Sequence, residues 1–227
     1  MCFSASASFG AGIILSAITI GTIKKTEEPH QIYFSFIPLI FCIQQISEGL
    51  LWLSLTDLAF TPLQQPTTYV FLFFAQVVWP WWLPYSVLQL EQDKTRKKLI
   101  RILFIMGALV SLYLASCLVL YPVEAKIIGY HITYRQDYPI RFGGYGDFIY
   151  SMATILPALL SSIKRMWILG IAIFISYAIT ILFYSDYVIS VWCFFASVIS
   201  FTVLFILAKM KNKNERLTAN SKRQLHA

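Results

Sequence analysis

Residues 94–121 read KTRKKLIRILFIMGALVSLYLASCLVLY, a basic cluster followed by a long apolar run. A helix that crosses the hydrocarbon of a bilayer needs about 20 mostly apolar residues, and residues 99–121 supply them. A soluble helix of this length would carry a charged stripe along its outer face. Here the only charged residue after the basic cluster is Arg101. The stretch therefore predicts a transmembrane helix that begins at a basic membrane surface.

The same pattern recurs along the chain and predicts an all-α, polytopic membrane helix bundle. Of the 227 residues, 58% are hydrophobic and 13% charged, and the mean hydropathy is +0.66. Soluble domains carry about 25% charged residues. Seven transmembrane helices are predicted, at about 4–23, 31–55, 67–90, 99–121, 148–163, 166–183 and 187–208. Residues 1–208 form the predicted transmembrane domain, and residues 209–227 a basic tail.

A six-span alternative would join the fifth and sixth segments into one helix. That helix would hold Lys164 and Arg165 in mid-membrane. A charge at the bilayer centre costs at least about 2.5–3.5 kcal/mol. Seven spans are therefore the preferred prediction.

The basic residues predict the orientation. All but three of the 18 lysines and arginines lie in alternate connections, at 24–25, 94–101 and 164–165, and in the tail after Ala208. Cytoplasmic connections carry such an excess, so the N-terminus is predicted outside and the C-terminus in the cytoplasm. No basic residue precedes Lys24, which favours an uncleaved first span over a signal peptide. The +7 charge then reflects topology and attraction to anionic lipids, not nucleic acid.

The outer loop, residues 122–147, contains two apolar and aromatic runs, 126–134 and 138–142, on either side of Arg135-Gln136-Asp137. Two such runs around a polar turn predict a β-hairpin. Two alternatives stay open at this point. The hairpin either caps the outer end of the bundle or is an ordinary solvated loop.

Glu48 is the only acidic residue inside a predicted span. Intramembrane carboxylates usually face the bundle interior and belong to functional paths. Gln44 and Gln45 lie one turn before Glu48, and Trp52 lies one turn after it, so the four residues form a polar stripe. The alternative is a hydrogen-bonded clasp between helices with no further role.

Further pocket candidates are aromatic. Trp79 lies in the sequence WPWWLP, near the bilayer middle, where Pro80 and Pro84 predict a kinked helix. Trp192 lies at about the depth of Glu48, in the last span. Tyr134, together with His131, would reach this end of the bundle from the outer loop.

Cysteine and histidine suggest a second kind of site. Cys2, His131 and Cys193 all lie near the predicted outer side and, with Glu48, could bind zinc or copper. No closely spaced pair of ligands supports such a site. A disulfide between Cys2 and Cys193, or between Cys117 and Cys193, is an alternative that suits an oxidising exterior, as are buried free thiols.

These residues predict an outward-facing polar pocket that binds or transports a small molecule or an ion. A first alternative is an outer-leaflet membrane enzyme that uses a thiol or a metal-bound water, with Glu48 as acid or base. A second alternative is a membrane sensor or assembly protein whose basic tail contacts a partner. The residues do not decide whether the protein is an enzyme.

Three stretches resemble an uncharacterised family of bacterial multi-pass membrane proteins. They are the opening MCFSASASF, residues 44–52 (QQISEGLLW) and residues 190–196 (SVWCFFA). The similarity covers most of the seven predicted spans but not the tail. It implies residence in the bacterial inner membrane and brings no established activity.

Overall fold

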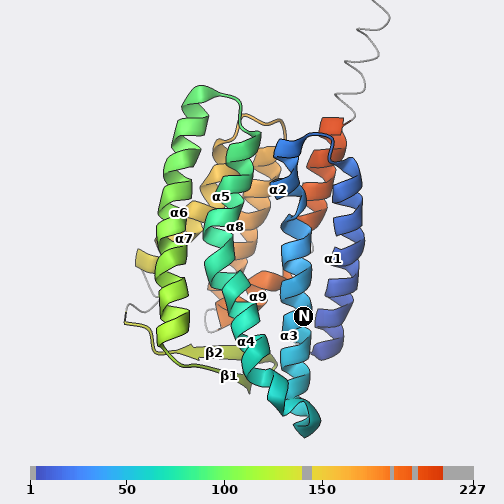
Figure 1. The fold of residues 1–227 in the computed structure, drawn as a ribbon, viewed down its shortest axis with the longest axis vertical. Coiled ribbons are helices and arrows are strands. Elements are labelled where there is room, and N and C mark those ends of the chain that lie inside the picture. The colour runs from blue at the N-terminus through green and yellow to red at the C-terminus, as the bar shows by residue number, and fades with distance from the viewer. Residues whose placement is uncertain (1–3, 140–144, 185–186, 196–198, 212–227) are drawn as a thin grey trace, which may run out of the picture.

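The structure is a computed structural model that describes residues 4–139, 145–184, 187–195 and 199–211, and it is a bundle of long helices (Figure 1). The first half comprises α1 (Ala5–Lys25), η1 (Pro29–Gln31), α2 (Ile32–Ser35), α3 (Ile37–Thr56), η2 (Leu58–Leu63), α4 (Gln64–Leu72), η3 (Phe73–Val78) and α5 (Trp79–Leu90). The second half comprises α6 (Lys94–Leu120), β1 (Val123–Ile128), β2 (His131–Gln136), α7 (Tyr145–Leu160), α8 (Met166–Phe183) and α9 (Val188–Phe194). Residues 199–211 are also helical.

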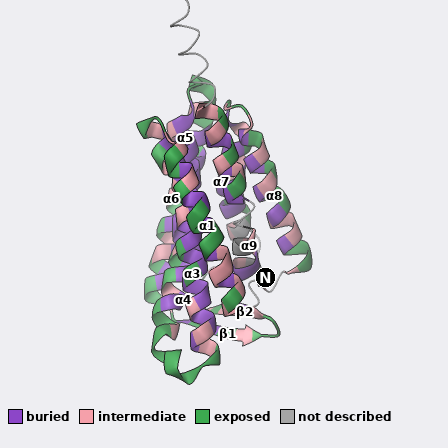
Figure 2. Ribbon diagram, turned by 90° about the vertical axis from the view of Figure 1, so that its right-hand side faces the viewer, coloured by how far each residue is buried: buried purple, intermediate pink, exposed green. Residues whose placement is uncertain are grey.

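Five helical stretches within the described residues are long and apolar enough to cross a membrane. They are Ala5–Lys25, Pro29–Thr56, Leu58–Leu90, Lys94–Leu120 and Met166–Phe183, and Phe148–Leu160 is a shorter apolar helix. Their outer faces are exposed (Figure 2) and apolar, as at Leu109, which is 63% exposed. This combination indicates a membrane protein.

Five of the seven predicted spans, at about 4–23, 31–55, 67–90, 99–121 and 166–183, correspond to these helices. α7 ends at Leu160 and α8 begins at Met166, so the fifth and sixth predicted spans are separate helices. Of the predicted seventh span, the structure describes α9 and the helical residues 199–211.

Helices α1 and α3 pack closely through small residues. A Cβ on Gly12 would lie 3.0 Å from the side chain of Ile46, and one on Gly49 would lie 2.9 Å from the ring of Phe9. Small residues let helix backbones approach in this way when lipid gives no hydrophobic drive to association. This contact fixes α3, and with it Glu48, beside the N-terminal part of α1.

The WPWWLP sequence distorts the third helical stretch, as predicted, because Pro80 and Pro84 have no backbone N–H to donate. Pro80 lies two residues after Val78, the last residue of the π-helical segment η3, in which each carbonyl normally accepts a hydrogen bond from the N–H five residues later. The expected donor for the Ala75 carbonyl is therefore the nitrogen of Pro80, but a proline nitrogen carries no hydrogen to donate. The hydroxyl of Tyr150, on α7, instead donates to the Ala75 carbonyl at 2.5 Å. A π-helical turn in the third stretch is thus held by a side chain from another helix.

The outer loop forms the predicted hairpin, but its turn is in a different place. β1 and β2 are antiparallel, and Ile128 pairs with His131. The two-residue turn is Gly129-Tyr130, with Gly129 at φ +63°, rather than the predicted Arg135–Asp137. Glycine adopts positive φ without a steric penalty, and this outweighs the polarity of the later residues.

The opposite end of the bundle is held by a carboxylate. Glu91 follows α5 and is 1% exposed. It accepts hydrogen bonds from both the N–H (2.7 Å) and the hydroxyl of Ser162, and from the Ser161 hydroxyl (2.9 Å). Arg96 also donates to the carbonyl of Ser161, at 3.0 Å. The connection between α5 and α6 is therefore tied to the connection between α7 and α8.

Candidate functional site

The carboxylate of Glu48 lies in the interior of the bundle and joins two distant segments. Glu48 lies on α3 and is fully buried. The hydroxyl of Ser190, on α9, donates to Oε1 at 2.6 Å, and the amide of Gln45 donates to Oε2 at 3.4 Å. Ser190 is itself fully buried. The sequence prediction that Glu48 faces inward agrees with this geometry.

Gln44 lies one turn deeper and belongs to a second polar pair. Because successive residues of a helix differ by about 100°, Gln44 and Gln45 face different neighbours. The indole N–H of Trp79, on α5, donates to the Gln44 side-chain oxygen at 3.0 Å. The Trp79 ring also stacks on Phe41, with centroids 4.0 Å apart. Trp79 and Gln44 thus join α3 to α5 in the core, next to the Glu48 turn.

Two further polar groups near Glu48 are buried without a hydrogen-bond partner among the described residues. They are the hydroxyl of Ser8 and the indole N–H of Trp52. Ser8 precedes Phe9, whose ring lies against Gly49, and Trp52 lies one turn after Glu48. Buried polar groups are nearly always satisfied, and unsatisfied ones are found where water or a ligand binds. Both groups can donate a hydrogen bond.

The hairpin covers this end of the bundle (Figure 1). Ala125 and Ile132, one from each strand, pack against Leu51 and Trp52 of α3 in a small apolar cluster. This contact agrees with the first of the two alternatives for the outer loop, in which the hairpin caps the end of the bundle.

Two candidates from the hairpin are held by aromatic contacts. Tyr134 stacks on Phe71 of α4, with centroids 5.1 Å apart. His131 stacks on Tyr187 at 4.4 Å, and burial lowers the pKa of its imidazole below the ordinary value. His131 therefore connects the hairpin to the residue that immediately precedes α9.

Trp192 lies away from Glu48. Its indole N–H donates to the hydroxyl of Ser176, on α8, at 3.1 Å, and its ring contacts Tyr150 and Tyr177. Trp192 is two positions after Ser190, a rotation of about 200°, which places the two side chains on opposite sides of α9. Trp192 therefore packs α9 against α7 and α8, while Ser190 faces the carboxylate.

The candidate thiol and metal ligands are only partly described. Cys2 and the side chain of Cys193 lie outside the described residues. Cys117 and Cys42 are buried free thiols, so the Cys117–Cys193 disulfide is not formed in this structure. Among the described side chains, no three His, Cys, Asp or Glu residues gather as metal ligands.

A polar cluster around Gln76 of the π-helical segment was not predicted from the sequence. Gln76 and Gln136 of β2 exchange amide hydrogen bonds of 2.9 and 3.1 Å. The hydroxyl of Tyr138 also reaches the Gln76 oxygen, at 3.5 Å. The sequence did contain a sign of this cluster, because Gln76, like Gln44, is a polar amide residue within an apolar span. Its partners lie 60 or more residues away and could not be read from local spacing.

These features define a mostly helical membrane protein with a buried polar centre under a β-hairpin. The chain belongs to DUF6629, a family of unknown function, whose model matches residues 1–219. This confirms membership of an uncharacterised family with no established activity, and the match extends into the tail. No curated protein and no solved structure matches the chain.

Proposed function

We propose that this protein is a seven-span inner-membrane protein that binds or transports an ion or small molecule at Glu48, from the hairpin side. Its N-terminus is outside and its C-terminus in the cytoplasm. The proposed orientation is supported by the basic connections, which meet at the end opposite the hairpin. There Lys211 pairs with Glu27 at 3.6 Å, and Arg96 bonds the α7–α8 connection. An excess of cations at one end is typical of the cytoplasmic side.

The observation that carries the proposal is the full burial of Glu48, with two donors that lack partners among the described residues, one on the next turn of α3 and one on the facing helix α1. An ionised carboxylate in a membrane interior is costly unless a proton, a cation or strong donors accompany it. Here a hydroxyl and an amide donate to it, and the hydroxyl of Ser8 and the indole N–H of Trp52, which have no hydrogen-bond partner among the described residues, would donate to water or a ligand. A carboxylate that takes up a proton or a cation, next to spare donors for the ligand, is the arrangement that coupled binding requires.

The location of Ser190 suggests how binding would be transmitted. The short helix α9 contacts both α3 and β2. A proton or cation on Glu48 competes with the Ser190 hydroxyl for Oε1, so binding would weaken the link between α3 and α9. Since His131 stacks beside the start of α9, the hairpin would respond to that change.

The test is infrared difference spectroscopy of the full-length protein in lipid vesicles, titrated with acid and then with Na⁺. We expect the carboxyl band of a buried acid to respond to both, to vanish in Glu48→Gln, and to shift in Ser190→Ala. Glu124→Gln, at an exposed hairpin carboxylate, is the matched control and should keep the band.

A flux measurement gives a second readout in the same vesicles. Wild-type protein should dissipate an imposed pH or Na⁺ gradient faster than Glu48→Gln. If wild type and Glu48→Gln are the same in both the infrared and the flux measurements, Glu48 is only a clasp between helices and the proposal is wrong.

A further inference from the structure

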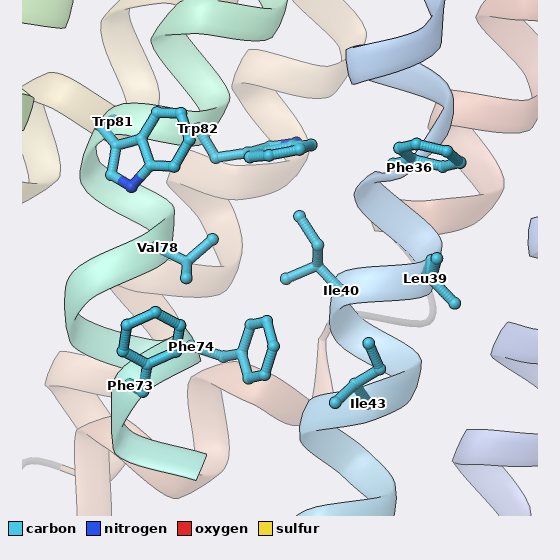
Figure 3. A pocket seen from close by; sticks show the side chains of 9 residues that line it. All are labelled: Phe36, Leu39, Ile40, Ile43, Phe73, Phe74, Val78, Trp81 and Trp82. Atoms are coloured by element: carbon cyan, nitrogen blue, oxygen red, sulfur yellow. The ribbon is translucent and has the colours of Figure 1, made fainter. Parts of the chain in front are cut away.

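An apolar groove lies on the side of the bundle, between the α2–α3 junction and the η3–α5 segment (Figure 3). Its volume is about 320 Å³. All the side chains that line it are aliphatic or aromatic, including Phe36, Ile40 and Ile43 on one wall and Phe73, Phe74 and Trp82 on the other. Ile43 is 37% exposed and Phe73 is 45% exposed, so the groove opens sideways.

Both walls of the groove are interrupted helices. On one side, α2 ends at Ser35 and α3 begins at Ile37, because Pro38 offers no N–H to the preceding turn. On the other side, the π-helical segment η3 leads into Pro80. Prolines and π-helical turns are the usual causes of kinks in helices. The groove therefore follows from the fold itself.

We propose that this groove holds an acyl chain of an anionic phospholipid from the surrounding membrane. A groove with only apolar walls gives water no partners, and at this depth in a bilayer the medium is hydrocarbon. A methylene group is about as large as a water molecule, which occupies about 30 Å³ in the liquid. The groove therefore has room for roughly ten methylene groups. That is a large part of one acyl chain.

One end of the groove has the aromatic residues of a membrane interface. Tyr33 lies one turn before Phe36, and the indole of Trp82 donates to the Tyr33 carbonyl at 3.0 Å. The rings of Tyr33 and Tyr85 are 4.8 Å apart. Tyrosine and tryptophan gather where hydrocarbon meets headgroups, so this end marks the depth of the lipid glycerol.

Cations lie beyond that aromatic end and select the headgroup. Tyr85 contacts Phe104 of α6, with centroids 5.6 Å apart. Lys97 and Arg101 precede Phe104 by seven and three residues, which places all three on one face of α6. A phosphate anchored near Tyr85 would lie within reach of both cations. An anionic headgroup gains more from them than a zwitterionic one.

This proposal rests on the membrane placement of the bundle, given under Proposed function, and is independent of the Glu48 site. The test is native mass spectrometry of the full-length protein in a mild detergent with equal amounts of phosphatidylglycerol and phosphatidylcholine. We expect wild type to retain phosphatidylglycerol preferentially. Ile43→Trp should remove most of the bound lipid by filling the groove, and Phe73→Trp, at the other rim, is a second variant of the same kind.

The two cations are tested separately from the groove. Lys97→Gln combined with Arg101→Gln should weaken phosphatidylglycerol binding by about tenfold or more, at about 1 kcal/mol per interfacial cation, and should leave phosphatidylcholine binding unchanged. Leu109→Trp, on the exposed face of α6, and Lys164→Gln, in another basic connection, are the matched controls and should bind as wild type does. Melting temperatures show that each variant is folded.

Three outcomes would overturn the proposal. Unchanged lipid retention in folded Ile43→Trp or Phe73→Trp would show that the lipid does not bind in the groove. Equal retention of both lipids would show that the site does not select an anionic headgroup. A dimeric wild type that becomes monomeric in Ile43→Trp assigns the groove to a second copy of the chain. Glu48→Gln should retain lipid as wild type does, so failure of the Glu48 proposal is seen separately.

Discussion

Gly107 of α6 lies directly against the backbone carbonyl of Pro80. A Cβ at Gly107 would be 1.8 Å from the Pro80 oxygen and 2.7 Å from its carbon. That carbonyl would normally bond the N–H four residues later, but the residue there is Pro84. The freed carbonyl therefore faces the only residue type that leaves room for it, and α6 approaches α5 at the kink.

Gly107→Ala should destabilise the protein strongly. The clash is with backbone, which cannot move aside as a side-chain end can, so we expect a loss of about 3 kcal/mol, the upper range for overpacking. Thermal unfolding in detergent measures it. Gly10→Ala on α1 is the matched control, because nothing lies within 4 Å of its Cβ position, and it should be neutral or slightly stabilising. Equal stability of the two variants would contradict the close approach of α6 to α5.

Tyr150→Phe should destabilise the π-helical segment. The change removes the 2.5 Å donor to the Ala75 carbonyl, and a buried acceptor left unsatisfied costs about 1–3 kcal/mol. We expect a lower melting temperature and faster hydrogen exchange in residues 73–80. Tyr130→Phe, at a tyrosine that is 78% exposed in the hairpin turn, should change neither. Unaltered exchange in Tyr150→Phe would show that the segment is stable without this bond.

Glu91→Gln should lower stability at neutral pH. Burial alone would raise the pKa of the Glu91 carboxyl, but hydrogen bonds from Ser162, from the Asp93 N–H and from Ser161 outweigh it and hold the pKa below its ordinary 4.5. The carboxylate thus contributes stability above pH 4.5, and this is lost as the pH falls through the folded-state pKa. We expect Gln to cost about 2 kcal/mol at neutral pH.

The difference between wild type and Glu91→Gln should shrink as the pH falls below 4.5. Melting curves over a pH series measure this, with Glu124→Gln as the exposed control. A difference that stays constant with pH would mean that the charge of Glu91 is not what holds the two connections together.

Acid should weaken the contact between the hairpin and the bundle. Burial lowers the pKa of His131 below 6.5, so the native state favours neutral imidazole stacked on Tyr187. The stability from this burial is present above pH 6.5 and is lost as the pH falls through the lower, folded-state pKa. The protection factors of amides in 123–136, which correct for the slower intrinsic exchange in acid, should therefore fall as the pH is lowered for wild type and much less for His131→Phe. The same acid response in both would assign it to another group.

Much of the helical architecture could be predicted because membrane helices are marked by local composition. The apolar runs gave α1, α3, α6 and α8 to within a few residues. The hairpin was predicted correctly, but its turn was expected at the polar residues Arg135–Asp137. The turn lies at Gly129 because glycine adopts positive φ without a steric penalty. Glu48 stood out for a similar local reason, since a carboxylate in an apolar run is rare whatever surrounds it.

Local sequence is enough to identify which segments are apolar enough to cross a membrane, which connections are basic, and that Glu48, Gln44 and Gln45 share a short stretch of one helix. The contacts between helices came from the packing: Ser190 meets Glu48, Trp79 donates to Gln44, and Glu91 accepts hydrogen bonds from Ser161 and Ser162. The two kinds of information differ in how far apart along the chain the interacting residues lie. Hydropathy and helical spacing are properties of neighbours along the chain, whereas these hydrogen bonds depend on which helix faces meet, and that is settled by close contacts such as Gly107 on Pro80 and Gly49 on Phe9.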